Sequence, residues 1–419
     1  MSGEIPEIRV GVFPRSRRPA FSRGPGRRKF APNPTLESVR MASVIVLGAG
    51  RVGAAMARDL AADGLDVAAA DADPAALARL EMGPRPVRGV HVDLSDPEQL
   101  GRRVQGHDLV IGAVPGPMGY RTVRGVLAAG VDIVDISFFE EDAFTLDAEA
   151  RRRGVVAVVD AGVAPGLSNL ILGHWEHRLR AVHRFECLVG GIPADPEPPW
   201  RYRAPFSPID VIAEYTRPAR LRRDGETVTL PALSELERVE VEGVGEMEAF
   251  NTDGLRTLLR TSVTPELVEK TLRWPGHADR VRLLRDSGFL SSDPVDVDGR
   301  PIAPLSVSAR LLSDAWAYGP DEADLTVMRV VVEGADAEGP VRHVYRLLDR
   351  YDPETGVSSM ARTTGYTATA IARLVLDGGY REPGVSPPER VAAADGALDR
   401  VVAALRDRGV GLEHEVVRS

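Results

Sequence analysis

Three glycines near the start of the chain have the spacing of a phosphate-binding turn. Gly48, Gly50 and Gly53 follow a short apolar run, and the alanine-rich segment 54–62 comes directly after them. In such a turn the first glycine permits the bend, the second lets the backbone approach a pyrophosphate, and the third lets helix and strand pack closely. The helix that follows offers free N–H groups and a positive dipole end to phosphates. The sequence therefore predicts a dinucleotide-binding site.

An acidic residue, Asp71, ends the next apolar run, 18 residues beyond Gly53. A carboxylate at this place accepts a hydrogen bond from the ribose 2′-OH of NAD and repels the 2′-phosphate of NADP. No basic residue follows until Arg79. We therefore expect NAD as the cofactor, with NADP less favoured.

Apolar runs alternate with helical segments from residue 44 to residue 160. The expected strands are 44–47, 67–70, 90–93, 109–113, 133–136 and 155–160, and the expected helices are 54–62, 74–80, 97–104, 120–129 and 144–153. Near-continuous apolar strands separated by helices predict a parallel sheet covered on both faces, the doubly wound Rossmann type of α/β fold. Ligands bind beyond the carboxyl ends of such strands. We expect the loops there to contact the cofactor through Gly48, Gly50, Arg51, Val52, Gly53, Asp71, Asp93, Ala113, Val114, Pro115, Asp135 and Gly162.

The pattern changes after about residue 166, where strand pairs with tight turns appear. Asp224-Gly225 suits a two-residue hairpin, and 325–332 and 341–348 indicate a second antiparallel pair. A second, α+β domain follows from this pattern. The long helix expected over 361–376 is rich in small residues that suit packing against the first domain. The predicted organisation is a leader (1–41), a Rossmann domain (42–165), a substrate-binding and dimerisation domain (166–357) and C-terminal helices (358–419).

Lysine is nearly absent from the chain, whose only two lysines are Lys29 and Lys270. By period two, Lys270 shares a strand face with apolar and aromatic side chains. Desolvation lowers the pKa of such an amine and suits it to acid–base chemistry; the alternative is a strand-edge lysine whose stem covers an aromatic ring. Arg273, on the opposite face, and His277, after a Pro-Gly turn, are further candidates, because histidine carries protons near neutral pH.

Aromatic and acidic residues follow the fifth expected strand. Two interpretations of the segment 138–142 stay open: Phe139 and Glu140 border a pocket for a cationic amine, or the acids cap the next helix. The loop 114–119 is equally compatible with approach to the nicotinamide ribose and with an ordinary βα connection. The turn 160–169 opens a helix and suits a carboxylate or phosphate.

Charge and cysteine usage narrow the range of partners. The chain carries a net charge of −9, although its first 40 residues hold nine basic and three acidic side chains, so the remainder is more acidic still. Such a chain is a poor match for nucleic acid or an anionic membrane, and no apolar stretch is long enough to span a bilayer. One cysteine, Cys187, fits a reducing cytoplasm. His174 and His177 share a predicted helix without a nearby acid, so we expect no metal site. The leader lacks a secretory apolar core, and Met41 is the favoured start.

The chain resembles the saccharopine dehydrogenase/reductase superfamily, and within it lysine 6-dehydrogenase and its uncharacterised relatives. The resemblance is carried by segments 47–53, 160–166, 190–193, 196–199, 248–254, 270–277 and 360–366, in family order. It implies an amino-acid oxidoreductase and a homodimer, in which Lys270, Arg273, His277, Asn251 and Asp253 border the substrate cleft. The loops 137–142 and 114–119 depart from the lysine 6-dehydrogenase pattern, which puts the substrate side chain in doubt.

From these residues we expect an NAD(P)-dependent enzyme that oxidises a C–N bond of an amino acid or opine. Hydride would pass to the nicotinamide, and the resulting imine would be hydrolysed. Lys270 or His277 would be the base, and Arg273 or Arg362 would hold the substrate carboxylate. Two alternatives remain: a polyamine-forming reductive condensation, which Glu140 and its acidic neighbours would suit, and a non-catalytic NAD-binding sensor.

Overall fold

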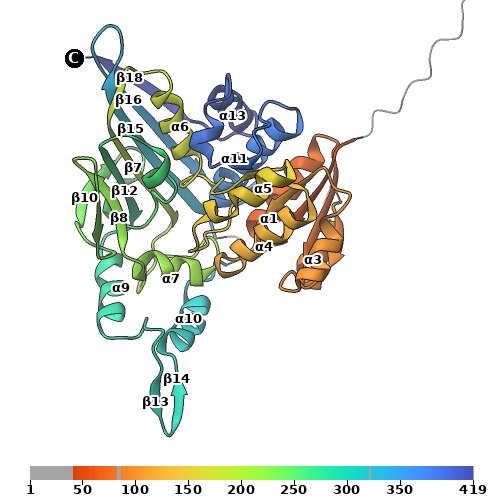
Figure 1. Ribbon diagram of the computed structural model, residues 1–419. Coiled ribbons are helices and arrows are strands. Elements are labelled where there is room, and N and C mark those ends of the chain that lie inside the picture. Colours follow the sequence, from red (N-terminus) through yellow and green to blue (C-terminus); the bar gives the residue numbers. More distant parts are fainter. Residues whose placement is uncertain (1–40, 83–85, 320–321, 419) are drawn as a thin grey trace, which may run out of the picture. The chain divides into compact units, whose positions relative to one another are not determined.

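The alternating apolar runs of the first half form one parallel sheet, as predicted. The computed structural model describes residues 41–82, 86–319 and 322–418 (Figure 1). The first sheet contains β1 (Ser43–Leu47), β2 (Asp66–Asp71), β3 (Arg88–His91), β4 (Leu109–Gly112), β5 (Asp132–Asp135), β6 (Val156–Val158) and β17 (Gly384–Val385). Its strand order is β17-β6-β5-β4-β1-β2-β3, the Rossmann order with one strand added at an edge.

Alternate side chains of β1 enter two separate cores, which is why the strand is apolar throughout. Val44 and Val46 pack with α1, whereas Ile45 and Leu47 belong to the core beneath α3 and α4. The helices of this half are α1 (Arg51–Ala62), α2 (Pro74–Glu81), α3 (Pro97–Val104), α4 (Gly116–Ala129), the 3-10 turn η1 (Ala143–Leu146) and α5 (Asp147–Arg153). Helix α4 begins four residues earlier than the sequence pattern predicts, directly after Pro115, and carries Pro117 in its first turn, where the missing N–H of proline costs no helix bond.

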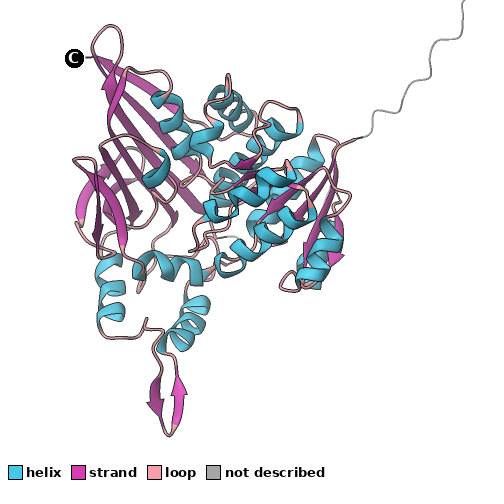
Figure 2. Cartoon of the chain, in the orientation of Figure 1, coloured by secondary structure: helices cyan, strands magenta, loops and turns pink. Residues whose placement is uncertain are grey.

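The second half forms a larger, mostly antiparallel sheet beside the first (Figure 2). Its strands are β7 (Ala181–Pro193), β8 (Ala219–Arg223), β9 (Glu226–Leu230), β10 (Glu237–Val241), β11 (Gly245–Asn251), β12 (Glu266–Arg273), β15 (Asp324–Ala335), β16 (Pro340–Arg350) and β18 (Glu413–Arg418). The predicted hairpin is β8–β9, with positive φ at both Asp224 and Gly225. The predicted pair 325–332 and 341–348 is β15–β16. The expectation of a Rossmann sheet with an α+β companion is confirmed.

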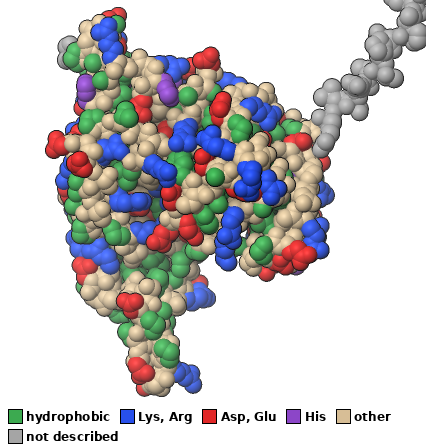
Figure 3. All heavy atoms as spheres, viewed as in Figure 1, with side chains coloured by type: hydrophobic (Ala, Val, Ile, Leu, Met, Phe, Trp, Pro, Cys, Tyr) green, Lys and Arg blue, Asp and Glu red, His purple; other side chains and the backbone are tan. Residues whose placement is uncertain are grey.

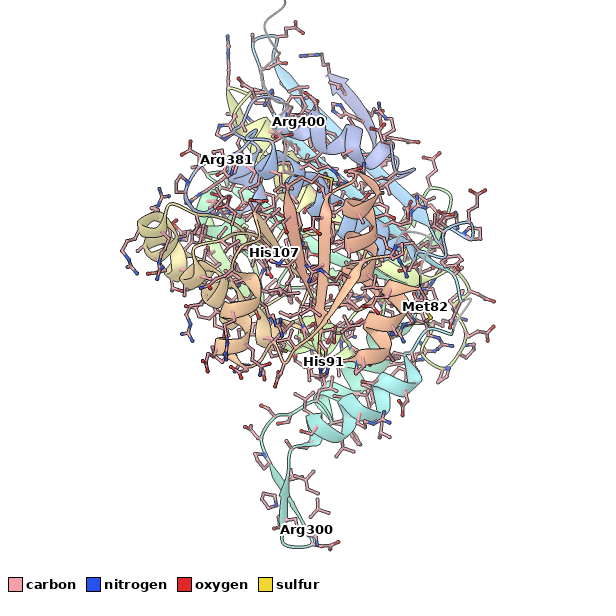
Figure 4. The ribbon with its side chains drawn as sticks, turned by 90° about the vertical axis from the view of Figure 1, so that its right-hand side faces the viewer. Met82, His91, His107, Arg300, Arg381 and Arg400 are labelled. Carbon is pink, nitrogen blue, oxygen red and sulfur yellow. The ribbon has the colours of Figure 1, made fainter. Side chains whose placement is uncertain are left out.

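Helices of the second half flank this sheet and extend from it. They are α6 (Leu167–Glu176), α7 (Pro208–Thr216), α8 (Leu258–Thr261), α9 (His277–Asp286), α10 (Pro304–Ala315), α11 (Ser359–Leu376), α12 (Pro388–Val391) and α13 (Ala397–Arg406). Between α9 and α10 the hairpin β13 (Val295–Val297) and β14 (Arg300–Ile302) projects from the body, with Arg300 at its tip (Figure 4). Figure 3 shows hydrophobic side chains on this projecting arm, where Val295 and Val297 are exposed.

Helix α11 lies against α1 and so joins the C-terminal segment to the first sheet. Contact is close at Gly365, where a Cβ would meet the Met56 side chain at 3.0 Å. A buried carboxylate on α1, Asp59, ion-pairs with Arg373 of α11 at 2.9 Å and with Arg408 beyond α13. Asp59 also accepts a hydrogen bond from the Thr369 hydroxyl at 2.5 Å. The C-terminal segment is not purely helical, since β17 and β18 also lie in it.

We predict that Asp59→Ala lowers the free energy of unfolding by about 3–5 kcal/mol, because it removes the buried anion of two partly buried guanidinium groups and leaves them only a solvent-exposed carboxylate. Asp63→Ala is the matched control: Asp63 pairs with the same two arginines but is 42% exposed, and its loss costs about 0–1 kcal/mol. Denaturant unfolding of both variants measures the difference. Equal destabilisation by the two variants would contradict the assignment.

Candidate active site

A cavity of about 840 Å³ is lined by both sheets. The carboxyl ends of the parallel strands form one side, and β7, β12 and the loops after α10 and β11 form the other. All the predicted cofactor contacts except Asp135 line this cavity: Gly48, Gly50, Arg51, Val52, Gly53, Asp71, Asp93, Ala113, Val114, Pro115 and Gly162. The loops at the carboxyl ends of the strands therefore meet in one place, as the topology requires.

The glycine turn has the geometry of a dinucleotide cradle. A Cβ on Gly53 would lie 1.9 Å from the Gly48 carbonyl oxygen, and Gly48 has a φ of 104°. A Cβ on Gly50, in contrast, would meet nothing within 4 Å, so the backbone is open on that side. Gly50 precedes α1, and no side chain caps the N–H groups of this helix start. Backbone donors are therefore available to a pyrophosphate.

Asp71 lies at the end of β2 beside the glycine turn. One carboxylate oxygen accepts from the backbone N–H of Ala49 at 2.6 Å, and the other accepts from that of Asp73 at 2.8 Å. These bonds fix the carboxylate at the cavity wall, where an adenosine ribose lies in Rossmann folds.

Asp135 was predicted to contact the cofactor, but it does not line the cavity. Its side chain is fully buried and accepts from the backbone N–H and the hydroxyl of Ser137, at 3.0 and 2.7 Å. Burial raises the pKa of Asp135 to about 7. A Cβ on Gly112 would lie 1.9 Å from one of its oxygens, so Asp135 fills space between β4 and β5. Residues after it, Ser137 and Phe138, reach the cavity instead.

A buried ion pair joins the two sheets at the cavity. Arg256, in the loop after β11, donates to Asp160 at the end of β6 at 2.8 Å and to the Phe139 carbonyl at 2.8 Å. Burial raises the pKa of Asp160, while the Arg256 charge opposes that rise. Arg256 also lies over the Phe138 ring, 4.6 Å from its centroid. The pair therefore fixes both walls near the expected nicotinamide end.

Strand β12 presents only one of its faces to the cavity. Glu269, Thr271 and Arg273 line it, whereas Lys270 does not. The Lys270 ammonium points to the other side, where it donates to the Glu237 carboxylate at 2.7 Å and to the Glu235 carbonyl at 2.9 Å. Lys270, expected to border the substrate cleft, therefore lies on the strand face opposite the cavity, and the face that carries Arg273 is the one that meets it.

His277 does not line the cavity either. It is fully buried among aromatic rings, with its ring nitrogens bonded to the Trp200 carbonyl at 3.1 Å and the Tyr215 hydroxyl at 3.0 Å. Burial lowers the pKa of His277 to about 3, and the Arg273 charge acts in the same direction. A neutral histidine in this position stabilises the packing beneath the site and has no access to a substrate.

Arg273 and Asp253 line the cavity, as the family resemblance implied. Arg273 is already engaged by the Glu214 carboxylate at 2.8 Å and the Tyr215 hydroxyl at 3.0 Å. Asp253 binds the guanidinium of Arg220 through two bonds of 2.8 Å. Both side chains are thus held in ion pairs at the cavity wall.

The remaining substrate candidates lie away from the cavity lining. Asn251 donates to the Ser234 hydroxyl at 3.1 Å, Phe139 is fully buried in the core, and Arg362 pairs with Asp349 at 3.3 Å. The Glu140 side chain is 81% exposed. The neighbouring acid Asp142 accepts from the Phe144 backbone N–H at 2.9 Å, so for this acid the helix-capping interpretation of the segment is confirmed.

Glu269, which lines the cavity from β12, is not among the site residues predicted from the sequence. Its Oε2 accepts from the Thr252 hydroxyl at 2.8 Å and from the Gly254 backbone N–H at 3.2 Å. Burial raises the pKa of Glu269 to about 8, and the carboxylates of Glu214 and Asp253 act in the same direction. The available signal was an acidic residue at an inward position of a buried strand, four residues before Arg273 and on the same strand face.

Residues 41–82, 86–319 and 322–418 contain no group of three or more histidine, cysteine, aspartate or glutamate side chains arranged to hold a metal ion. No helix there combines the length and the apolar character needed to cross a membrane.

A glycine turn on a Rossmann sheet, opening into a cavity shared with a second α+β sheet, defines the class of dinucleotide-binding oxidoreductases. Comparison with family models places the chain more closely. Residues 44–158 match the saccharopine dehydrogenase NADP binding domain, and residues 162–410 match the saccharopine dehydrogenase C-terminal domain. The chain belongs to the saccharopine dehydrogenase family, which confirms the resemblance and a pyridine nucleotide as cofactor.

Relatives and a solved structure agree with this placement. The L-glutamate-forming, NADP(+) saccharopine dehydrogenase of Saccharomyces cerevisiae is 23% identical over 83% of this chain and 93% of its own length. The mitochondrial alpha-aminoadipic semialdehyde synthase of Bos taurus is 22% identical over 73% of this chain, which spans 41% of that longer protein. The apo structure of the yeast saccharopine dehydrogenase has the same fold, with a TM-score of 0.73, 21% identity and coverage of 90% of this chain and all of that one.

We predict that Glu269→Gln changes the pH dependence of stability. The folded protein keeps the Glu269 proton between about pH 4.5 and about pH 8, where the unfolded chain has released it, so folding loses stability as pH rises through this range. Glutamine cannot ionise. The difference in melting temperature, variant minus unsubstituted protein, should therefore increase steadily from about pH 4.5 to about pH 8.

Glu242→Gln, which changes an exposed carboxyl in the β10–β11 turn, serves as the control. Its melting temperature relative to the unsubstituted protein should not increase with pH in this way. If Glu269→Gln and Glu242→Gln gave parallel curves, Glu269 would not hold a proton in the folded state.

Proposed function

We propose that this protein is a pyridine-nucleotide-dependent oxidoreductase that acts on a C–N bond of an amino acid or opine. The observation that carries the proposal is a single cavity that joins the glycine turn to the ionisable side chains of β12. The family relatives support it, because they include saccharopine dehydrogenases and an aminoadipic semialdehyde synthase.

Residues at different places along the cavity would have different roles in binding the cofactor and the substrate. The open backbone at Gly50 and the start of α1 bind the pyrophosphate, and Asp71 orients the adenosine ribose. A bound nicotinamide supplies the hydride acceptor. Trp316, Tyr318 and Phe206 supply aromatic wall around the substrate end and exclude water from it.

The acids that suggested a polyamine-forming condensation do not line the cavity. These acids lie in segment 138–142, and neither Glu140 nor its two acidic neighbours reach the cavity lining. A non-catalytic sensor would not need the buried carboxyl and guanidinium groups that β12 places there. A C–N oxidoreductase accounts for both ends of the cavity.

A direct test is to follow absorbance at the NADH band with NAD or NADP and a panel of lysine, ornithine, saccharopine and diamines. We expect reduction of the cofactor with at least one amino acid or opine. Reduction by lysine alone would place the chain with lysine 6-dehydrogenases. No reduction by any panel member, with cofactor binding intact in a thermal-shift control, would contradict the proposal.

The choice between NAD and NADP is a separate proposal. The fungal relatives are named for NADP, which favours that cofactor here as well. Against it stands Asp71, whose fixed carboxylate lies where a 2′-phosphate would place its negative charge. We propose that this local charge decides the preference and that NAD is used.

Asp71→Ser should then raise the kcat/KM ratio of NADP to NAD by about tenfold or more, because a like-charge repulsion is removed. Asp73→Ser is the control, since serine preserves the α2 cap and Asp73 does not line the cavity. Steady-state kinetics with both cofactors measure the ratio. An unsubstituted enzyme that prefers NADP would overturn the proposal and follow the fungal relatives.

Two wider proposals follow from the family resemblance and the single buried cysteine: the protein forms a homodimer and works in the cytoplasm. Light scattering coupled to size exclusion measures the first. A monomer at micromolar concentration would reject it.

A further inference from the structure

The substrate end of the cavity holds an excess of acidic over basic side chains. The acids that line this end are Asp160, Asp210, Glu214, Asp253 and Glu269, and the base that lines it is Arg273. A cavity meant for a substrate rich in carboxylates would present unpaired guanidinium groups. Arg273 donates to the Glu214 carboxylate, the Tyr215 hydroxyl and the Leu272 carbonyl, so each nitrogen of its guanidinium already has an acceptor.

Most of these acids are also neutralised within the protein. Asp160 pairs with Arg256, Glu214 with Arg273 and Asp253 with Arg220. Asp210 accepts the Gly116 backbone N–H through both oxygens, at 3.2 Å, at the positive end of α4.

Glu269 differs from its acidic neighbours. Among the residues that the structure describes, it has no ion-pair partner, and its two hydrogen bonds both reach Oε2. Oε1 receives no hydrogen bond from the described residues and is not among their buried unpaired atoms, so it faces the cavity space. The Thr252 hydroxyl, which holds the carboxyl at Oε2, is itself 2.7 Å from the Thr271 hydroxyl.

We propose that Glu269 binds a cationic amino group of the substrate through Oε1, and that the site is therefore built for an amine-rich substrate, a basic amino acid or diamine, in preference to one rich in carboxylates. The proposal rests on the proposed function and deepens it by naming the substrate class.

The same contact has a chemical consequence. An ammonium group must lose a proton before the hydrogen on its carbon can leave as hydride. A Glu269 carboxylate in contact with the substrate can take that N–H proton, while the C–H bond delivers its electron pair to the nicotinamide and a C=N bond forms. Protons and electrons balance without any further reactant.

The test measures binding rather than turnover. With saturating NADH present, which cannot accept a hydride, 1,4-diaminobutane and glutarate serve as amine and carboxylate probes of similar length, and calorimetry gives their dissociation constants. We expect the diamine to bind more tightly than glutarate. Glu269→Gln should weaken diamine binding by about tenfold or more, because the charge-assisted bond is lost while the shape is kept.

Glu266→Gln is the matched control, an acid-to-amide change on the same strand at a position that does not line the cavity, and it should leave diamine binding within about twofold. NAD affinity reports whether each variant is folded. Tighter binding of glutarate, or equal diamine binding by Glu269→Gln, would overturn the proposal.

A second measurement needs no variant. Burial raises the pKa of Glu269 to about 8, so near pH 7 the empty site holds a proton that an ammonium ligand must displace. Diamine binding to the unsubstituted protein should release close to one proton, measured as a dependence of the binding enthalpy on the ionisation enthalpy of the buffer. Binding without proton release would reject Glu269 as the receiving group. A failed turnover assay alone would reject the proposed reaction and leave these binding results intact.

Discussion

The ion pair between Asp160 and Arg256 is the contact on which the site depends. It joins the end of β6, in the parallel sheet, to the loop after β11, in the mixed sheet, and so holds these two parts of the protein together. Both partners are nearly excluded from water, and such a pair constrains geometry strongly because either charge alone would be costly to bury. The pair therefore ties together the two walls of the shared cavity.

Burial explains why ionisable groups of similar chemistry have different roles here. Asp135 and Glu269 are both buried carboxyls with raised pKa values, yet the first has its oxygens bonded by Ser137 inside the sheet and the second leaves one oxygen facing the cavity. His277 is kept neutral by the same physical effect acting on a base. Access to the cavity, rather than the shift itself, separates a structural group from a reactive one.

The sequence predicted the Rossmann half well because its signals are local. The glycine spacing, the apolar runs and Asp71 at the end of β2 each depend on a few consecutive residues. The substrate side depends on how sheets dock, which no local pattern contains. Period two separated Lys270 from Arg273 correctly, but only the packed structure shows that the Arg273 face meets the cofactor domain, and that Glu269 is its neighbour there. The rarity of lysine singles out Lys270, whose ammonium lies on the strand face opposite the cavity.

The last segment of the chain contributes one edge strand to each sheet, β17 to the parallel sheet and β18 to the mixed one. Because a strand cannot pair before it is synthesised, the parallel sheet is complete only after Gly384–Val385 has been made, and the mixed sheet only after Glu413–Arg418. The nucleotide half, although encoded first, thus reaches its final form only after a segment more than 200 residues beyond β6 has been added. A nascent chain that stalls before residue 384 leaves both sheet edges unfilled.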